Sequence, residues 1–150
     1  MENYQITLSE TILSKAHSGE DTSALRRELY YIRRSTLYKK LNTDELKKMF
    51  WVNLFNAYVI IISNEPKQKI SMFKRKRIKI AQYLLSLDDI QYGILRMHKY
   101  KIGFCYINNP FYSSFIKMLA VTKLDYTIEP QLNRMDYHHK KNTKKAIIKQ

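Results

Sequence analysis

Two asparagines, Asn53 and Asn56, lie within the most apolar stretch of the chain, residues 49–62. An amide side chain both donates and accepts hydrogen bonds, and a spacing of three residues puts the two amides on neighbouring parts of one helix face. An amide that is buried without a partner costs about 1–3 kcal/mol, so we expect both side chains to be hydrogen-bonded. The main prediction is that they hold the backbone of an adjacent loop. A pocket lined by the two amides, with a direct catalytic role, is the alternative.

Cysteine and histidine offer little further chemistry. Cys105 is the one cysteine in the sequence, which excludes an intramolecular disulfide and a multi-cysteine metal site. Its neighbours Phe104 and Tyr106 are bulky, so we expect a buried structural thiol rather than a reactive one. His138 and His139 are adjacent, and adjacent side chains diverge on a regular element, so no metal site is predicted there. The sequence also lacks a phosphate-binding loop and a nucleotide-binding glycine pattern, and no cofactor is expected.

Positive charge is the strongest chemical signal, with a formal net charge of +14 and the densest run of cations at residues 74–77. Such a charge attracts anions in general, through a field that salt screens. The candidate anion or nucleic-acid contacts are Lys74, Arg75, Lys76, Arg77 and Lys79. Nucleic-acid binding also needs aromatic rings for stacking, whereas the aromatic residues downstream fall in apolar stretches that we expect to be core. Weak non-specific attraction of anions is therefore favoured over specific nucleic-acid binding.

Composition indicates one folded domain. The chain has 150 residues, of which 45% are hydrophobic, with only three glycines and three prolines. These values favour a mainly α fold with a sizeable core over a disordered chain or a many-turned β fold. We expect a single globular domain at 1–137 and a basic, frayed tail at 138–150. No signal peptide is visible and the apolar stretch is too short for a membrane span, so a cytoplasmic location is expected.

Hydrophobic spacing and capping residues predict the elements. The helices are expected at 8–17, 23–32, 35–41, 44–63, 86–96 and 111–119, and a small β-hairpin at 78–85. The 44–63 helix is apolar on every side, which is typical of a central, buried helix. Its predicted core-facing series is Leu46, Met49, Phe50, Asn53, Ala57, Ile60 and Ile61. Charge runs such as Arg26 and Arg27 are assigned to the solvated faces of the helices.

Two stretches resemble known signatures. Residues 50–57 read Phe-Trp-Val-Asn-Leu-Phe-Asn-Ala and resemble the Phe-Trp-Ile-Asn-Leu-Tyr-Asn-Ala signature of the domain of unknown function (DUF) family 547. Residues 86–96 resemble its second signature, Ser-Leu-Asp-Asp-Ile-Glu-His-Gly-Ile-Leu-Arg, and residues 123–126 are similar to the start of a third block. The similarity runs from about Thr7 to Asn133. The signature positions present in this chain are Trp51, Asn53, Asn56, Asp88, Asp89, Gly93 and Arg96.

The chain departs from the family at its reactive positions. Tyr92 stands where the second signature has histidine, and Gln91 replaces its glutamate. In the third block, Glu129 falls at the histidine, Arg134 at the first cysteine and His139 at the second. The family's cysteines and histidines suggest a thiol enzyme, and a thiolate nucleophile needs a cysteine with a nearby base or positive charge. We therefore expect no catalytic residues in this chain.

Three functions remain open from the sequence. The preferred one is a non-catalytic, divergent or shortened member of this family that acts, if at all, by binding a protein partner or, weakly, anionic partners. The first alternative is an enzyme of unknown reaction with a pocket near Asn53, Asn56 and the 86–96 helix. The second is a non-specific nucleic-acid binder that uses the cations at 74–79.

Overall fold

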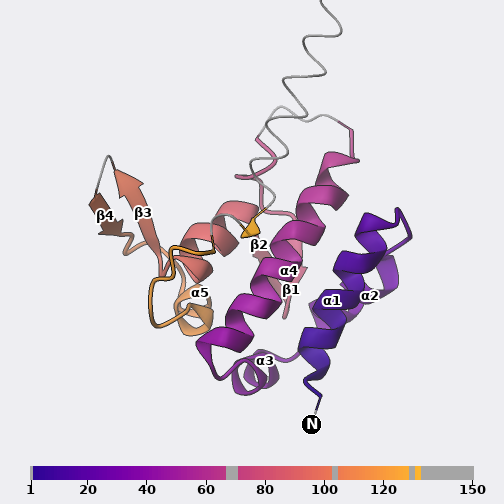
Figure 1. The fold of residues 1–150 in the computed structure, drawn as a ribbon, viewed down its shortest axis with the longest axis horizontal. Helices are drawn as coiled ribbons and strands as arrows, with labels where there is room; N and C mark the ends of the chain where they lie inside the picture. Colours follow the sequence, from indigo (N-terminus) through magenta and orange to yellow (C-terminus); the bar gives the residue numbers. More distant parts are fainter. Residues whose placement is uncertain (1, 67–70, 103–104, 129–130, 133–150) are drawn as a thin grey trace, which may run out of the picture.

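The computed structural model describes residues 2–66, 71–102, 105–128 and 131–132, with the backbone alone for the strands at 99–108 (Figure 1). The elements in chain order are α1 (Tyr4–His17), α2 (Ser23–Tyr31), α3 (Arg34–Lys40), α4 (Asp44–Ser63), β1 (Ile78–Ile80), β2 (Tyr83–Leu85), the π-helix η1 (Asp89–Leu95), β3 (Lys99–Ile102), β4 (Cys105–Asn108) and α5 (Ser114–Leu119). The fold is mainly helical, as the composition predicts, with two small antiparallel β-hairpins among the described residues, one of which the sequence predicts.

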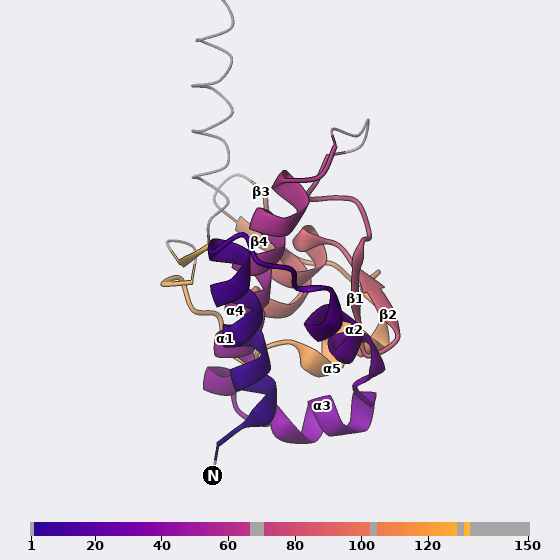
Figure 2. The same cartoon turned by 90° about the vertical axis from the view of Figure 1, so that its right-hand side faces the viewer.

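The long helix α4 runs through the middle of the molecule (Figure 1). In that view α1 and α2 lie on one side of it, and α5 and the β3–β4 hairpin lie on the other. The second view shows α1 alongside α4 and the β1–β2 hairpin beside α2 (Figure 2). Buried apolar residues from all the helices and from β1–β2 form one cluster around α4. The expected central helix is therefore confirmed.

Helix α4 begins at Asp44, directly after the N-cap residue Thr43 that the sequence predicts. The Thr43 hydroxyl oxygen accepts a hydrogen bond from the Leu46 amide at 3.2 Å, which caps the first turn. Farther along, Phe50, Trp51, Leu54 and Phe55 are completely buried. Met49, which was predicted to face the core, is 46% exposed, so the core-facing series was wrong at that position. A helix packed on several sides gives little periodicity, and the buried face cannot then be read from spacing alone.

The first turn of α4 also holds a distant segment, residues 120–125. The Asp44 carboxylate accepts hydrogen bonds from the Thr122 amide and hydroxyl at 2.9 Å and from the Lys123 amide at 3.0 Å. The Lys47 ammonium, which is almost fully buried, donates to the Ala120 carbonyl at 2.8 Å. Lys48 forms an ion pair with Asp125 at 3.0 Å. We call this group of contacts the α4 clamp.

The predicted β1–β2 hairpin is present, and it is attached to α2. Ile78 pairs with Leu85, and Ile80 pairs with Tyr83. The two turn residues, Ala81 and Gln82, both have positive φ angles, 50° and 60°. Their amides donate to the Leu29 and Tyr30 carbonyls at the end of α2, each at 2.9 Å. The hairpin turn thus satisfies carbonyls that the end of a helix otherwise leaves unpaired.

Other element boundaries differ from the prediction. Helix α1 begins four residues earlier than expected, because Asn3 rather than Thr7 accepts the capping hydrogen bond, from the Gln5 amide at 3.1 Å. Helix α5 begins at Ser114, where the Ser113 hydroxyl caps the Ile116 amide at 3.3 Å. The β3–β4 hairpin was not predicted at all.

In the described part of the chain, none of the helices combines the length and the apolar character that a bilayer crossing requires. Within the same residues, no three His, Cys, Asp or Glu side chains gather as the ligands of a metal ion would. The expected tail at 138–150 lies outside the described residues.

Candidate functional site

Asn53 joins the central helix to α1. Its side-chain amide donates to the Ser9 hydroxyl oxygen at 3.1 Å. Ser9 is fully buried, and its own hydroxyl donates to the Ile6 carbonyl at 2.7 Å. The partner is therefore a side chain on a neighbouring helix, whereas the sequence predicted loop backbone.

Asn56 makes the contact that the sequence predicted for both asparagines. Its side-chain amide donates to the Gln131 carbonyl at 2.9 Å, so it holds the backbone of a segment 75 residues away. Both asparagine side chains are half-buried. From one helix, the two amides thus reach two different parts of the chain.

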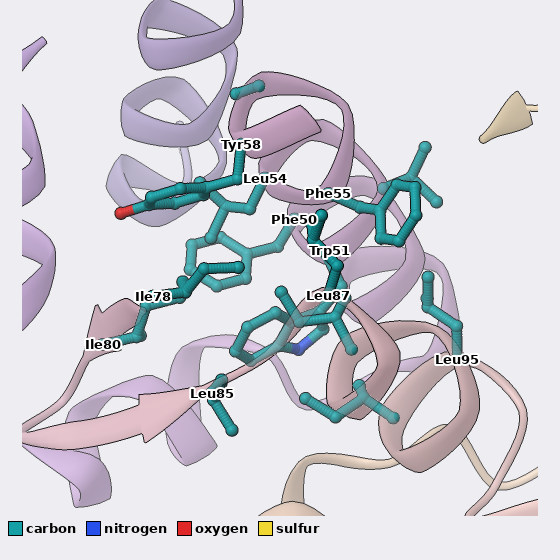
Figure 3. Packing of buried hydrophobic residues seen from close by; sticks show 14 of the residues in the cluster. Phe50, Trp51, Leu54, Phe55, Tyr58, Ile78, Ile80, Leu85, Leu87 and Leu95 are labelled. Atoms are coloured by element: carbon teal, nitrogen blue, oxygen red, sulfur yellow. The ribbon is translucent and has the colours of Figure 1, made fainter. Parts of the chain in front are cut away.

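Trp51, the first signature residue, is a core side chain. It is completely buried and packs edge to face against Phe50, with ring centroids 4.9 Å apart. Figure 3 shows its indole reaching from α4 toward the part of the core that contains Leu85 and Leu87. Its contribution is to packing.

Asp89 closes the N-terminus of η1. Its carboxylate accepts from the Ser86 amide at 2.9 Å, and the Ser86 hydroxyl oxygen accepts from the Asp89 amide at 3.0 Å, which is the capping box that the sequence predicts. The same carboxylate pairs with Lys76 at 3.0 Å. The preceding Asp88 donates its backbone amide to the Phe73 carbonyl at 3.0 Å. The two aspartates therefore connect η1 to the segment that carries the basic run.

Gly93 permits a close approach between η1 and α5. A Cβ atom at this position would lie 2.8 Å from Ile116 Cγ2, closer than real Cβ atoms come, and 3.1 Å from Tyr112 Cε1, which is also unusually tight. Its carbonyl accepts from the His98 amide at 2.8 Å, five residues on, as in a π-helix. Glycine is therefore required here by packing.

Tyr112, which the sequence did not single out, lies against this part of η1. Burial, together with the charges of Asp89 and Asp88 and the nearby Tyr92, raises the pKa of its phenol to about 12. The group stays protonated at neutral pH. Its place against η1 depends on how α5 packs, so no local sequence signal could have identified it.

Tyr92 occupies the position where the second signature has histidine. The Arg96 guanidinium lies over its ring, 5.0 Å from the ring centroid, in a cation–π arrangement. Within the 86–96 signature, Asp89 pairs with Lys76 of the basic run and Gly93 packs on α5, whereas the amides of Asn53 and Asn56 donate to Ser9 of α1 and to Gln131.

The five cations of the basic run have different environments. Lys76 pairs with Asp89, and Arg77 pairs with Glu65 at the end of α4. The other three side chains, Lys74, Arg75 and Lys79, are exposed. The run is therefore partly a structural connection and partly a solvent-facing set of charges.

A cavity of about 570 Å³ lies between α2, the C-terminal half of α4 and β1. Its lining residues are Ser23, Arg26, Arg27, Tyr30, Tyr31, Tyr58, Ile61, Ile62, Glu65, Arg77 and Lys79. A second, more open cavity of about 410 Å³ lies beside α1 and is lined by Glu10, Thr11, Ser14, Lys15 and Glu20. The enzyme alternative expects a pocket near Asn53, Asn56 and the 86–96 helix. None of these residues lines either of the two cavities.

A model of the family described as proteins of unknown function, DUF547, matches residues 38–141. That range covers most of the chain and contains both signature stretches. The chain belongs to the DUF547 family. No curated protein and no solved structure matches it significantly. The DUF547 match begins at residue 38, so α1 and α2 precede it, whereas the resemblance seen in the sequence starts near Thr7. Of the departures from the DUF547 pattern, Glu129, Arg134 and His139 lie outside the described residues.

Proposed function

We propose that this DUF547 chain is a non-catalytic domain that acts by binding an anionic partner. The observation that carries the non-catalytic part of the proposal is that the signature side chains form hydrogen bonds within the fold. Asn53 is hydrogen-bonded to α1, Asn56 to the backbone at Gln131, and Asp89 to the cap of η1. Side chains engaged in this way serve the fold rather than a substrate.

The chemistry of the replaced residues supports the same proposal. Histidine is the side chain that exchanges protons most readily near neutral pH, and Tyr92 stands in its place. Arg134, at the position of the family's first cysteine, is neither a thiolate nor a base, because its guanidinium stays protonated. Cys105, the one thiol, precedes the third block of the family.

Charge supports the second half of the proposal. A net charge of +14 gives the chain a field that draws in anions, and Lys74, Arg75 and Lys79 present exposed cations to them. Charge alone attracts many anions, so the proposed binding is broad in specificity.

The experiment compares the full chain with its Cys105→Ser variant in assays of ester, thioester and peptide hydrolysis, together with native labelling of Cys105 by an electrophilic probe. We expect no turnover that depends on the thiol, and slow labelling that accelerates on unfolding. Turnover that the wild type performs and Cys105→Ser abolishes would overturn the non-catalytic proposal. Failure of the full chain to bind any polyanion at low salt would overturn the binding half.

A further inference from the structure

The cavity between α2, α4 and β1 is strongly cationic. Four of its lining side chains are cations, Arg26, Arg27, Arg77 and Lys79, against the single carboxylate of Glu65. Arg77 is paired with that carboxylate. The positive charge of the other three is therefore left uncompensated by the lining of the cavity.

Arg26 has an unused donor in this region. Its Nε is buried and has no hydrogen-bond acceptor among the described residues. Buried polar groups in folded proteins are almost always paired, so an anion bound in this cavity could supply the acceptor that this donor lacks. A guanidinium is the side chain best shaped to bind a phosphate or carboxylate through two parallel hydrogen bonds.

Tyrosines form the rest of the lining. Tyr30 and Tyr31 pack edge to face, with ring centroids 5.1 Å apart, and Tyr31 is 64% exposed. Tyr58 is almost fully buried, and Figure 3 shows its hydroxyl pointing away from Phe55 and Trp51. Burial raises the pKa of the Tyr58 phenol to about 12, against the opposing charge of Arg26. The phenol therefore stays protonated at neutral pH and keeps an O–H that can donate to an anion.

The β1–β2 hairpin builds this cavity. Its turn is hydrogen-bonded to the last carbonyls of α2, which brings Lys79 of β1 to the helix that carries Arg26 and Arg27. The spacing of four residues from Arg26 to Tyr30, and from Arg27 to Tyr31, places each arginine one helical turn before a tyrosine. Cations and aromatic rings are thus combined on one wall, opposite α4.

We infer that this cavity binds a mononucleotide, with the phosphate held by Arg26, Arg27 and Lys79 and the base against the exposed Tyr31 ring. A volume of about 570 Å³ suits a ligand of this size. Phosphate contacts from cations, combined with stacking on an aromatic ring, are the two features that nucleotide recognition requires. The inference rests on the proposed binding function and gives it a definite ligand class.

The first experiment measures the affinity of the full chain for adenosine monophosphate, inorganic phosphate and adenosine by calorimetry. We expect adenosine monophosphate to bind at least about tenfold more tightly than either of its parts. Neutralising two cavity cations, in the double variant Arg27→Gln and Lys79→Gln, should weaken its binding about tenfold or more. The matched control is Lys39→Gln with Lys40→Gln, which removes the same charge from exposed residues of α3 outside the cavity and should change the affinity by less than about threefold.

A second pair of variants tests the ring. Tyr31→Ala should weaken adenosine monophosphate and leave phosphate unchanged, and because Tyr31 is 64% exposed the variant keeps its fold. Tyr38→Ala, at a 49% exposed position on α3, is the control and should alter neither affinity.

Two results would overturn the inference. One is a wild-type chain that does not bind adenosine monophosphate at millimolar concentration. The other is an equal loss of affinity in the two double variants, which would assign the binding to overall charge. In either case, salt-sensitive binding of a single-stranded oligonucleotide or an acidic peptide would leave the broader binding proposal standing. If the chain bound neither a mononucleotide nor any of these polyanions, both this inference and the broader binding proposal would be wrong.

Discussion

Asn53 and Asn56 illustrate how a polar residue can be used inside an apolar helix. Each amide reaches one group on a different segment, the Ser9 hydroxyl on α1 and the Gln131 carbonyl near the end of the described chain. Hydrophobic contacts alone tolerate small sliding movements between segments, whereas a hydrogen bond fixes one register. The two asparagines therefore set where α1 and the 131–132 segment sit on α4.

We expect Asn53→Ala to lower the free energy of unfolding by about 1–2 kcal/mol, because the buried Ser9 hydroxyl loses its donor. Asn56→Ala should cost about 1 kcal/mol, since its partner is a backbone carbonyl near solvent. Urea denaturation followed by circular dichroism measures both values. Asn42→Ala, at an exposed position between α3 and α4, is the control and should change stability by less than about 0.5 kcal/mol. Equal effects at positions 42 and 53 would contradict the role given to Asn53.

At the level of elements, the β1–β2 turn carries backbone strain. Ala81 and Gln82 adopt the left-handed conformation, which costs an L-residue other than glycine, asparagine or aspartate about 1–2 kcal/mol. The amides of the turn close the end of α2, so the conformation cannot relax without loss of those hydrogen bonds. Attachment to α2 thus explains why a turn without glycine keeps this shape.

Replacing Gln82 by glycine should therefore stabilise the protein by up to about 1 kcal/mol, since relief of strain exceeds the added entropy of the unfolded chain. Gln82 is exposed, so little packing is lost. The change is measured as a rise in the urea midpoint. Gln82→Ala, which keeps the strain, is the matched control and should leave the midpoint nearly unchanged. A lower midpoint for the glycine variant would show that the turn is not strained.

The α4 clamp makes a separate element-scale prediction about pH. Burial by itself would raise the pKa of Asp44, but the hydrogen bonds from Thr122 and Lys123 outweigh it and hold that pKa below its usual value. The Thr127 hydroxyl and Lys48 lower the pKa of Asp125 to about 2. Because folding lowers both pKa values, the stabilisation is complete above the unfolded pKa of about 4 and is lost as the pH falls toward about 2.

Asp44→Asn should therefore destabilise the protein at neutral pH and make its stability less dependent on pH between about 4 and 2. Glu45→Gln, on the same turn but exposed, serves as the control and should leave both properties nearly unchanged. Unfolding free energies measured across this pH range decide the matter. Parallel pH profiles for wild type and Asp44→Asn would exclude Asp44 as a source of acid sensitivity.

Local patterns predicted the elements whose signals are local. Each of three such signals is carried by residues that are neighbours in the sequence, and each predicted element was found. They are the Thr43 cap, the apolar residues of α4 and the alternation of Ile78 and Ile80. The π form of η1, in which the Gly93 carbonyl accepts from the His98 amide, has no local signal in the sequence and was missed. The cavity was missed for the same kind of reason. Arg26 and Arg27 were assigned to a solvated face, but the hairpin docks on α2 and makes that face one wall of the cavity.

At the scale of the whole molecule, the cations behind the net charge of +14 differ in how freely they can contact a partner, because some are paired with carboxylates of the same chain. Lys76 and Arg77 are paired with Asp89 and Glu65, although the Lys76 side chain is itself 57% exposed, and Lys74 and Arg75 are exposed as well. A polyanion that binds the basic run should therefore release counterions mainly through the second pair, because charges already paired within the chain contribute less.

We expect the affinity for a single-stranded oligonucleotide to fall steeply with salt. In a plot of log affinity against log salt concentration, Lys74→Gln with Arg75→Gln should reduce the slope by about 1.4, near 0.7 for each lost phosphate contact. Lys76→Gln with Arg77→Gln should reduce it by less, while lowering stability. Fluorescence anisotropy titrations at several salt concentrations measure the slopes. Equal reductions in both double variants would indicate that the internal ion pairs open when the polyanion binds.

The α4 clamp has a consequence for the lifetime of the folded state. Asp44 and Thr122 are 78 residues apart, so their contact closes a loop of about half the chain. Contacts at such a separation are costly to form early, and we expect this one to be absent from the folding transition state. A contact that forms after the barrier slows unfolding and leaves the folding rate unchanged. In stopped-flow experiments, Asp44→Asn should therefore raise the unfolding rate constant with little effect on the refolding rate constant. The α4 clamp would then contribute to the lifetime of the folded state as well as to its free energy.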